Sequence, residues 1–225
     1  SIRRVAIEDL LYRVPYAPEF ERISRAVFGK RVLVTGAGGS IGSEICRQLI
    51  RHGASAIVLL EISELHLFQI ERELRALVGD TGVELHAVSG DVRRAEQVRT
   101  AIRRSGGVDI VYHAAAYKHV DLMERNPVAC FQNNVIGTQV VASVAEEEGV
   151  KDFVLISTDK AVRHTSLMGA SKRVAERLLI ERPANGTACK AVRFGNVLGS
   201  NGSVVPIFRE QIARGGPVTV TSTEV

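Results

Sequence analysis

Residues 31–42 read RVLVTGAGGSIG, an apolar run that leads directly into a glycine-rich turn. The run is rich in β-branched residues and too short for a helix, so it predicts a buried strand. Gly36, Gly39 and Gly42 follow with GxxGxxG spacing and precede the helical pattern IGSEICRQLI. This order of strand, turn and helix predicts a βα unit whose backbone N–H groups face the pyrophosphate of a dinucleotide.

Further apolar runs follow at intervals, over residues 56–61, 84–89, 109–114, 152–158 and 189–194. Between the runs, apolar residues recur three and four positions apart, as in LHLFQIERELRAL, which is the pattern of amphipathic helices. Successive βα units predict a doubly wound parallel sheet with helices on both faces. Right-handed crossovers give the expected strand order 3-2-1-4-5-6 and a ligand crevice at the carboxyl ends of the strands.

The pattern divides the chain into three parts. Residues 1–29 form an amphipathic lead-in and residues 30–195 form the α/β Rossmann domain. The family resemblance described below implies that residues 196–225 begin a small substrate-binding lobe. The chain begins with Ser1 and ends at TSTEV without a closing element, so we expect a longer protein and a truncated lobe. Because so short a lobe cannot enclose a substrate, we expect poor turnover without further C-terminal residues.

Composition places the chain among globular proteins. Of its 225 residues, 45% are hydrophobic and 24% are charged, which suits one large core. The net charge of +4 is scattered among acidic residues, so we expect an anionic small molecule rather than nucleic acid as partner. Three cysteines without metal-ligand spacing predict buried thiols, no metal site and a reducing, cytoplasmic location. No apolar run reaches the ~18 residues of a spanning helix.

The glycine turn and the end of the second strand predict a site for NAD. We expect the turn to contribute Gly36, Gly39, Ser40, Ile41 and Gly42. The second strand ends at Glu61, where a carboxylate can accept hydrogen bonds from the adenosine ribose hydroxyls. No cation follows it in ISELHLF, and its charge would repel the 2′-phosphate of NADP, so NAD is the expected cofactor.

Two further segments border this predicted site. Asp91 follows the third strand, where its carboxylate can reach the adenine amino group, with Val92 beside it. Asp91 can equally be the N-cap of a helix that starts in VRRAEQV, and both interpretations stay open. After the fourth strand, Ala114, Ala115 and Ala116 offer small side chains where the chain passes the cofactor.

Long motifs elsewhere in the chain carry a family resemblance. They are HAAAYKHVDLMERNP (113–127) with NNVIGT (133–138), STDKAVRHTSLMGASKRVAE (157–176) and RFGNVLGSNGSVVPIFREQIARGGPVTVT (193–221). With TGAGGSIGSE (35–44), they make the chain resemble the polysaccharide-biosynthesis dehydratases. This is a branch of the extended short-chain dehydrogenases/reductases that removes water from UDP-N-acetylglucosamine. The resemblance runs from the lead-in to the last residue.

The resemblance implies a stepwise mechanism. NAD takes hydride from carbon 4 of the sugar, the proton on carbon 5 and a hydroxyl on carbon 6 leave, and hydride returns to carbon 6. Thr158, Asp159 and Lys160 lie together at the end of the fifth strand. We expect Thr158 to orient the carbon-4 hydroxyl and the other two to be the acid and base, with their individual roles open. Alternatively, this segment is a turn that Asp159 caps beside a solvated Lys160.

The usual catalytic tyrosine is replaced in this chain. In ordinary short-chain dehydrogenases a tyrosine stands four residues before the catalytic lysine, but MGASK places Met168 there, before Lys172. A thioether has no titratable proton, so Met168 can only pack or position. The replacement recurs in the membrane-anchored branch that the chain resembles. Lys172 is expected to hold the nicotinamide ribose, and Asn134 to support Lys172 through a helix or to be a buried polar residue bonded to backbone.

The remaining expectations concern substrate and partners. By resemblance alone, Lys118 and Asn196 bind the substrate, with a solvated lysine and a turn-forming asparagine as the alternatives. Two competing functions are a UDP-sugar 4-epimerase, which has no use for an extra acid and base, and a non-catalytic NAD-binding regulatory protein. We also expect a homo-oligomer, and a full-length protein anchored at the cytoplasmic face of the inner membrane.

Overall fold

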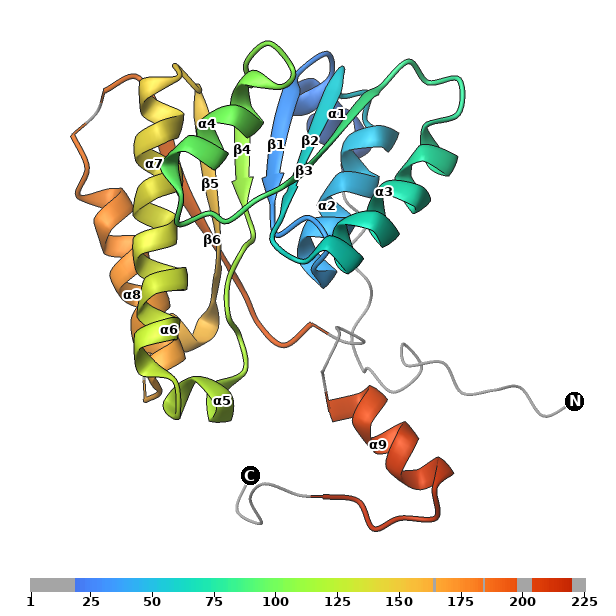
Figure 1. Ribbon diagram of the computed structural model, residues 1–225, viewed down its shortest axis with the longest axis vertical. Helices are drawn as coiled ribbons and strands as arrows, with labels where there is room; N and C mark the ends of the chain where they lie inside the picture. The colour runs from blue at the N-terminus through green and yellow to red at the C-terminus, as the bar shows by residue number, and fades with distance from the viewer. Residues whose placement is uncertain (1–18, 164, 184, 198–203, 220–225) are drawn as a thin grey trace, which may run out of the picture. The chain divides into compact units, whose positions relative to one another are not determined.

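The computed structural model describes residues 19–163, 165–183, 185–197 and 204–219 (Figure 1). They belong to two compact units, one formed by Glu19–Gly195 and the other containing Asn196–Val225. The expected lead-in up to residue 18, and residues 198–203 and 220–225 of the expected substrate lobe, lie outside the described residues. Within the second unit, the described helix is α9 (Val204–Ala213).

The first unit is built on a six-stranded parallel sheet with the order β3-β2-β1-β4-β5-β6, which confirms the expected topology. The strands are β1 (Arg31–Thr35), β2 (Ala56–Glu61), β3 (Glu84–Ser89), β4 (Ile110–His113), β5 (Asp152–Thr158) and β6 (Ala188–Phe194). The chain order reverses between β1 and β4. This switch point is where an open parallel sheet forms its ligand crevice.

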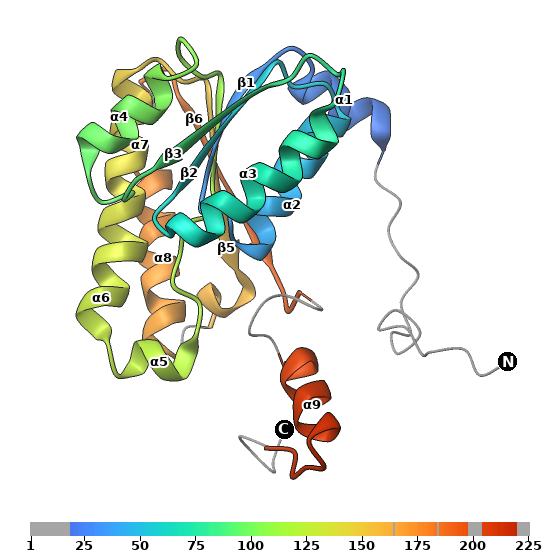
Figure 2. The same ribbon diagram turned by 45° about the vertical axis from the view of Figure 1, so that its right-hand side comes forward.

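Helices cover both faces of the sheet, with α2 and α3 on one side and α4, α7 and α8 on the other (Figures 1 and 2). The bounds are α1 (Phe20–Val27), α2 (Ser40–Arg51), α3 (Glu64–Val78), α4 (Ala95–Arg103), α5 (Val120–Glu124), α6 (Pro127–Phe131), α7 (Gly137–Glu147) and α8 (Leu167–Ile180). A π-helical turn (Gln132–Ile136) joins α6 to α7, and a 3₁₀ turn (Asp159–Ala161) follows β5. Helix α1, which the sequence assigned to the lead-in, belongs to the same unit as the sheet.

Successive side chains of each strand point to opposite faces of the sheet, so each face carries its own hydrophobic core. Leu33 and Phe153 face α4, α7 and α8, whereas Val34 and Leu59 face α2 and α3, and all four side chains are fully buried. Side chains two apart on a strand share a face, so the apolar runs of the sequence feed both cores at once. The two cores hold the strand ends in fixed positions.

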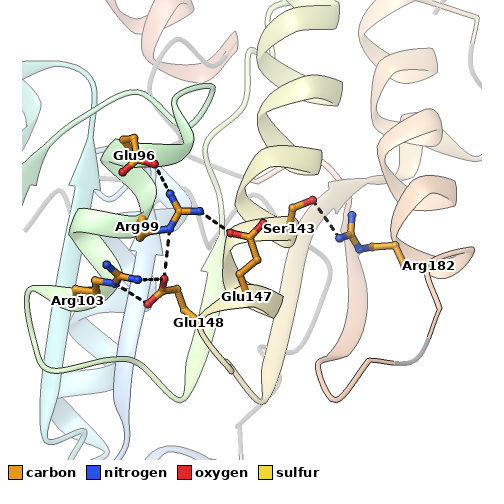
Figure 3. A network of polar contacts seen from close by, with 7 residues as sticks. All are labelled: Glu96, Arg99, Arg103, Ser143, Glu147, Glu148 and Arg182. Carbon is orange, nitrogen blue, oxygen red and sulfur yellow. Dashed lines mark hydrogen bonds and ion pairs between the residues drawn. The ribbon is translucent and has the colours of Figure 1, made fainter.

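Ion pairs connect α4 to the end of α7, on the outer side of the core that these two helices form with α8. Arg99 of α4 contacts Glu96 of its own helix and Glu147 of α7, and Arg103 forms a bidentate pair with Glu148 (Figure 3). These partly exposed pairs link α4 to the C-terminal end of α7. Their contribution to stability is modest because solvent screens exposed charges.

The residue at which α4 begins rules out one of the two roles expected of Asp91, that of helix N-cap. The helix begins at Ala95, and its N-cap is Arg94, which forms no side-chain capping bond. Asp91 instead accepts a hydrogen bond from the backbone N–H of Arg93, 2.9 Å away, and closes a turn before the helix. The N-cap interpretation was wrong because the Asp91 carboxylate is hydrogen-bonded within the turn that precedes the helix.

Candidate active site

The strands of the parallel sheet bring the candidate residues to one edge. β1 ends at Thr35, β2 at Glu61, β4 at His113 and β5 at Thr158. The segments that follow these strands carry the glycine turn, the three alanines and the Asp159–Lys160 pair. Residues far apart in the sequence therefore share the carboxyl edge of the sheet, as the strand order requires.

The glycine turn can exist only without side chains at two of its positions. Gly36 has φ +65°, and a Cβ on it would lie 2.7 Å from the Cα of Ala115. A Cβ on Gly42 would lie 2.1 Å from the carbonyl oxygen of Gly36. Gly39 donates its N–H to that same oxygen at 3.0 Å. The result is a tight backbone cradle at the N-terminus of α2, which suits a pyrophosphate.

Ser40 and Ile41 form the first turn of α2, directly after this cradle. The Ile41 side chain lines an apolar cavity of about 220 Å³ together with Ile23, Tyr112 and Phe194. Only the backbone of Ile41 is thus in a position to serve the cradle. On the opposite side of the turn, Ala114, Ala115 and Ala116 are half-buried, and Ala115 lies against Gly36.

The Glu61 carboxylate lies at the end of β2 and is 8% exposed. One of its oxygens accepts from the N–H of Gly38 at 3.1 Å, and the other accepts from the N–H of Ser63 at 3.0 Å. Each carboxylate oxygen has a second lone pair, so ribose hydroxyls can still donate to it. Glu61 therefore shapes the turn as well as offering acceptors.

Asp91 is held by a bidentate ion pair. The Arg93 guanidinium donates to both of its carboxylate oxygens, from Nε at 2.9 Å and from Nη2 at 2.6 Å. These hydrogen bonds outweigh burial and keep the pKa of Asp91 below its usual range. Val92, the next residue, is buried in the core and packs close to Gly137. Contact of Asp91 or Val92 with adenine stays a prediction.

Lys172 is a buried cation without a partner. Its side chain lies on α8 and is 4% exposed, and its Nζ has no hydrogen-bond partner among the described residues. Burial lowers the pKa of Lys172 to about 8, although the Glu176 carboxylate opposes the shift. An orphaned buried ammonium is costly, so a group that accepts its hydrogens is expected to complete the site.

Asn134 is fully buried in the π-helical turn, and its side chain is fully engaged. Its Oδ1 accepts from the N–H of Tyr117 at 2.8 Å, and its Nδ2 donates to the Tyr117 carbonyl at 3.0 Å and to Ser171 Oγ at 3.0 Å. Ser171 precedes Lys172 on α8. Asn134 thus bridges the segment after β4 and α8, and its support of Lys172 stays a prediction. π-Helical turns often occur at functional sites.

Met168 is packed in a small apolar cluster. It is 4% exposed and clusters with Met123 of α5 and Cys130 of α6. Its thioether is buried among sulfur-containing side chains that adapt to irregular space. The packing role is consistent with this position on the first turn of α8.

The segment at the end of β5 forms a compact polar group. The Thr158 hydroxyl donates to Asp159 Oδ1 at 3.1 Å, and Lys160 Nζ lies 3.5 Å from the same oxygen. Burial acts to raise the pKa of Asp159, but the bond from Thr158 and the Lys160 charge outweigh it and leave the pKa below its usual range. Thr158, rather than Asp159, is the N-cap of the 3₁₀ turn. This corrects the alternative in which Asp159 caps the turn.

The two expected substrate residues are both on the surface. Lys118 is exposed after β4, and Asn196 is exposed at the start of the other compact unit. Their roles stay predictions. Among the described residues, no cluster of three or more His, Cys, Asp or Glu side chains could hold a metal ion. No described helix is long and apolar enough to cross a membrane.

The sequence reasoning did not identify His113, which lies fully buried between Thr35 and Thr138. The available signal was its position directly before the three alanines, at the end of a strand whose other residues are apolar. A polar residue at a buried strand end next to the turn is a candidate for the site.

The fold, the cradle and the buried lysine on α8 together define an extended short-chain dehydrogenase/reductase. Within this class, the chain belongs to the polysaccharide biosynthesis protein family, whose model matches residues 32–225. The family expectation drawn from the sequence motifs is confirmed at this level.

The similar proteins include both dehydratases and epimerases. The chain is 48% identical to the probable polysaccharide biosynthesis protein EpsC of Bacillus subtilis, over 98% of the chain and 37% of that protein. It is 36% identical to a UDP-N-acetylglucosamine 4,6-dehydratase (inverting) of Campylobacter jejuni, over 86% of the chain and 58% of the enzyme. It is 34% identical to a UDP-glucose 4-epimerase of Rickettsia canadensis, over 85% and 56%. The chain thus spans less than two thirds of each relative.

Solved structures show the same fold. Pen from Bacillus thuringiensis superposes with a TM-score of 0.80 at 34% identity, over 87% of this chain and 61% of that one. DesIV, a dTDP-glucose 4,6-dehydratase from Streptomyces venezuelae, superposes with a TM-score of 0.68 at 25% identity, over 84% and 63%, and contains NAD.

Proposed function

We propose that this chain binds NAD and carries the catalytic residues of a nucleotide-sugar 4,6-dehydratase that acts on UDP-N-acetylglucosamine. The observation that carries the proposal is the adjacency of Asp159 and Lys160. Their side chains lie 3.5 Å apart at the end of β5, on the same edge of the sheet as the glycine cradle. Elimination of water needs an acid and a base close to each other, whereas epimerisation at carbon 4 needs neither in addition.

Two features of the chain fit NAD. The cradle around Gly36 and Gly42 leaves no space for a Cβ, which lets backbone N–H groups approach a pyrophosphate. Within the part of the chain that the structure describes, the buried Lys172 Nζ has no hydrogen-bond partner, and the hydroxyls of the nicotinamide ribose are acceptors of the required kind. No lysine or arginine follows Glu61 in residues 62–68, which favours NAD over NADP. DesIV, with the same fold, binds NAD.

Bound NAD would supply the hydride chemistry of the reaction, the removal of hydride from carbon 4 of the sugar and its return to carbon 6, and the glycine cradle and Lys172 would hold it. The proton transfers are assigned to residues of the chain itself. Thr158 is proposed to orient the carbon-4 hydroxyl, and the bond from its own hydroxyl to Asp159 at 3.1 Å supports this role. Asp159 is ionised at neutral pH, so it can accept a proton directly, and an acid role would require proton uptake first. Lys160 completes the pair, and Met168 contributes no proton.

Similarity at the sequence level supports the same substrate class. The Campylobacter jejuni relative is a UDP-N-acetylglucosamine 4,6-dehydratase, and the alignment includes most of this chain. The second candidate is a UDP-sugar 4-epimerase, which the Rickettsia canadensis relative favours. A purely regulatory NAD-binding protein would not be expected to retain Asp159, Lys160 and Lys172 together. Homo-oligomerisation and membrane anchoring of a longer protein remain predictions.

The deciding experiment incubates the purified protein with UDP-N-acetylglucosamine and analyses the nucleotide sugar by mass spectrometry. The proposal predicts a product that has lost one water and absorbs in alkali as a 4-keto-6-deoxy sugar. A product of unchanged mass with inverted carbon 4 would favour the epimerase instead. NAD binding, measured separately by calorimetry, distinguishes failure of catalysis from failure of the cofactor site.

A further inference from the structure

His113 lies between two threonines in the interior of the first unit. Its Nδ1 is 2.7 Å from Thr35 Oγ1, at the end of β1, and its Nε2 is 3.1 Å from Thr138 Oγ1, on α7. The exposed fractions of the three residues are 0%, 0% and 1%. The three side chains are closed to bulk solvent, so the direction of each bond follows from the number of hydrogens that these groups carry.

The direction is fixed at Thr138. Its hydroxyl is 2.7 Å from the carbonyl oxygen of Asn134, and a carbonyl oxygen can only accept, so Thr138 donates its single hydrogen there. The same hydroxyl must therefore accept from His113. This requires a hydrogen on Nε2 of the imidazole.

The direction continues through Thr35. In a neutral imidazole with a hydrogen on Nε2, Nδ1 is an acceptor, so the Thr35 hydroxyl donates to it. Thr35 Oγ1 then has lone pairs for the N–H of Ala115, which lies 3.3 Å away. The result is a chain of four hydrogen bonds with one direction, from Ala115 N–H through Thr35, His113 and Thr138 to the Asn134 carbonyl.

The surroundings keep the imidazole neutral. Complete burial, together with the charge of Lys172, lowers the pKa of His113 to about 3. A second hydrogen on Nδ1 would also leave Thr35 without its acceptor. Geometry and electrostatics therefore select the same tautomer.

The hydrogen-bond chain ends at Ala115 on one side and at Asn134 on the other, and each of these residues contacts a different part of the candidate site. Ala115 packs directly on Gly36 of the glycine cradle. Asn134 bonds to Tyr117 and to Ser171, the neighbour of Lys172. We propose that His113 is a positioning residue that, as a neutral Nε2–H imidazole, couples the glycine cradle to the π-helical turn that carries Asn134. The functional role of this coupling rests on the proposed NAD site, whereas the tautomer of His113 follows from its hydrogen bonds alone.

The tautomer is tested first, by nitrogen NMR of protein labelled at histidine. We expect His113 Nε2 to carry the hydrogen and Nδ1 to be unprotonated at pH 7, both with and without NAD. Spectra of His113→Gln assign the signals by loss. A hydrogen on Nδ1, or averaging between the two tautomers, would overturn the inference whether or not NAD binds.

Two variants of His113 then test the two ends of the hydrogen-bond chain separately. His113→Asn places an acceptor near the Nδ1 position and keeps the bond from Thr35, whereas His113→Gln places a donor near the Nε2 position and keeps the bond to Thr138. The readouts are the Kd for NAD and the hydrogen-exchange rate of the Tyr117 amide, which Asn134 protects. His113→Gln should weaken NAD about tenfold and leave Tyr117 protected, since one buried hydrogen bond is lost at the cradle end.

His113→Asn should show the reverse, with NAD affinity within about threefold of wild type and Tyr117 exchange about tenfold faster. A merely structural role would give both variants the same loss in both readouts, and that outcome would overturn the proposal. If either variant fails to fold, Thr138→Val and Thr138→Ser replace them. Valine should speed up Tyr117 exchange and serine should not. Absence of NAD binding in the wild type would contradict the proposed function alone, because the tautomer and the exchange rate are measured without NAD.

Discussion

The carboxylate of Glu61 accepts a hydrogen bond from the backbone N–H of Gly38, 3.1 Å away. This bond ties the end of β2 to the glycine turn after β1, so the residue expected to bind ribose also helps to shape the cradle. A Cβ on Gly38 would come within 2.5 Å of His66 Cβ, so the turn is confined from the α3 side as well. The same carboxylate that shapes the loop is thus the one expected to govern cofactor choice.

We predict that NAD binds more tightly than NADP and that Glu61→Ala weakens NAD binding by about 1 to 3 kcal/mol, the range of hydrogen bonds to a charged group. Glu61→Gln is the matched control, because it keeps an acceptor for Gly38 but loses the charge that repels a 2′-phosphate. Calorimetric titration with each dinucleotide measures both effects. Tighter binding of NADP to the wild type would contradict the assignment.

Glu61 also illustrates how far the sequence leads. Strand ends and glycine spacing are local patterns, so the cradle and the position of Glu61 were predictable from residues 31–61. The sheet order followed from the succession of βα units up to residue 194. The pairing of Asp91 with Arg93 was not, because a side chain two residues away competed with both expected roles of the carboxylate. Such competition depends on rotamers and backbone turns, which the apolar pattern does not encode.

Residues joined across the sheet were the hardest to predict. Thr35 and Thr138 meet His113 only because β1, β4 and α7 pack together, and their sequence separation gives no sign of it. The orphaned amine of Lys172 is likewise a property of packing, although the identity of the lysine followed from the motif. Tertiary contacts thus supply the electrostatic part of the site.

The pair at the end of β5 should be essential for elimination but not for cofactor binding. We predict that Asp159→Asn and Lys160→Ala each abolish water loss from UDP-N-acetylglucosamine while NAD affinity changes less than threefold. Both side chains are largely exposed and belong to the 3₁₀ turn, apart from the glycine cradle. Product analysis and calorimetry on the same preparations provide the comparison. Near-normal turnover in either variant would show that the pair is structural.

Met168 should tolerate a change that conserves volume. Because it packs with Met123 and Cys130 and carries no titratable proton, Met168→Leu is expected to cost less than about 1.5 kcal/mol in unfolding free energy. Met168→Ala, which leaves a cavity, is expected to cost about 2 to 5 kcal/mol. Chemical denaturation of both variants tests the packing role. A severe loss of activity in a stable Met168→Leu protein would instead indicate a chemical role for the thioether.

Glu176 should make stability depend on pH in the acidic range. Its buried carboxylate accepts from Arg193 at 2.9 and 2.6 Å and from Ser157 at 2.6 Å, and the Arg193 bonds foremost lower its pKa below 4.5. A carboxylate with a lowered native pKa stabilises the fold above the unfolded pKa, and that stability is lost as pH falls through the native pKa. Glu176→Gln should lose about 1.5 to 3 kcal/mol at pH 7. The difference from wild type should shrink below pH 4.5, and a constant difference in denaturation experiments would contradict this.

Lys172 should also make stability rise with pH, but in the alkaline range. Its native pKa is about 8, whereas the unfolded value is 10.5, so between these values the unfolded chain holds a proton that the native protein has released. Stability then rises with pH, because the unfolded state binds more protons. A shift of this size corresponds to about 3 kcal/mol gained by the wild type between pH 8 and pH 10.5.

The matched variant is Lys172→Met, which keeps most of the side-chain volume without the charge. We expect it to be more stable than wild type at pH 7, since no described residue offers the buried ammonium a hydrogen bond, and to lose that advantage as pH rises towards 10.5. Denaturation curves of both proteins over this range give the difference directly, because all other titrating groups are shared. Saturating NAD should raise the apparent pKa of Lys172 in the wild type, since acceptors on the ribose favour the charged form. Parallel pH profiles for the two proteins would mean that the ammonium is already satisfied in the native state, and the case for Lys172 as the ribose-binding residue would lose its physical basis.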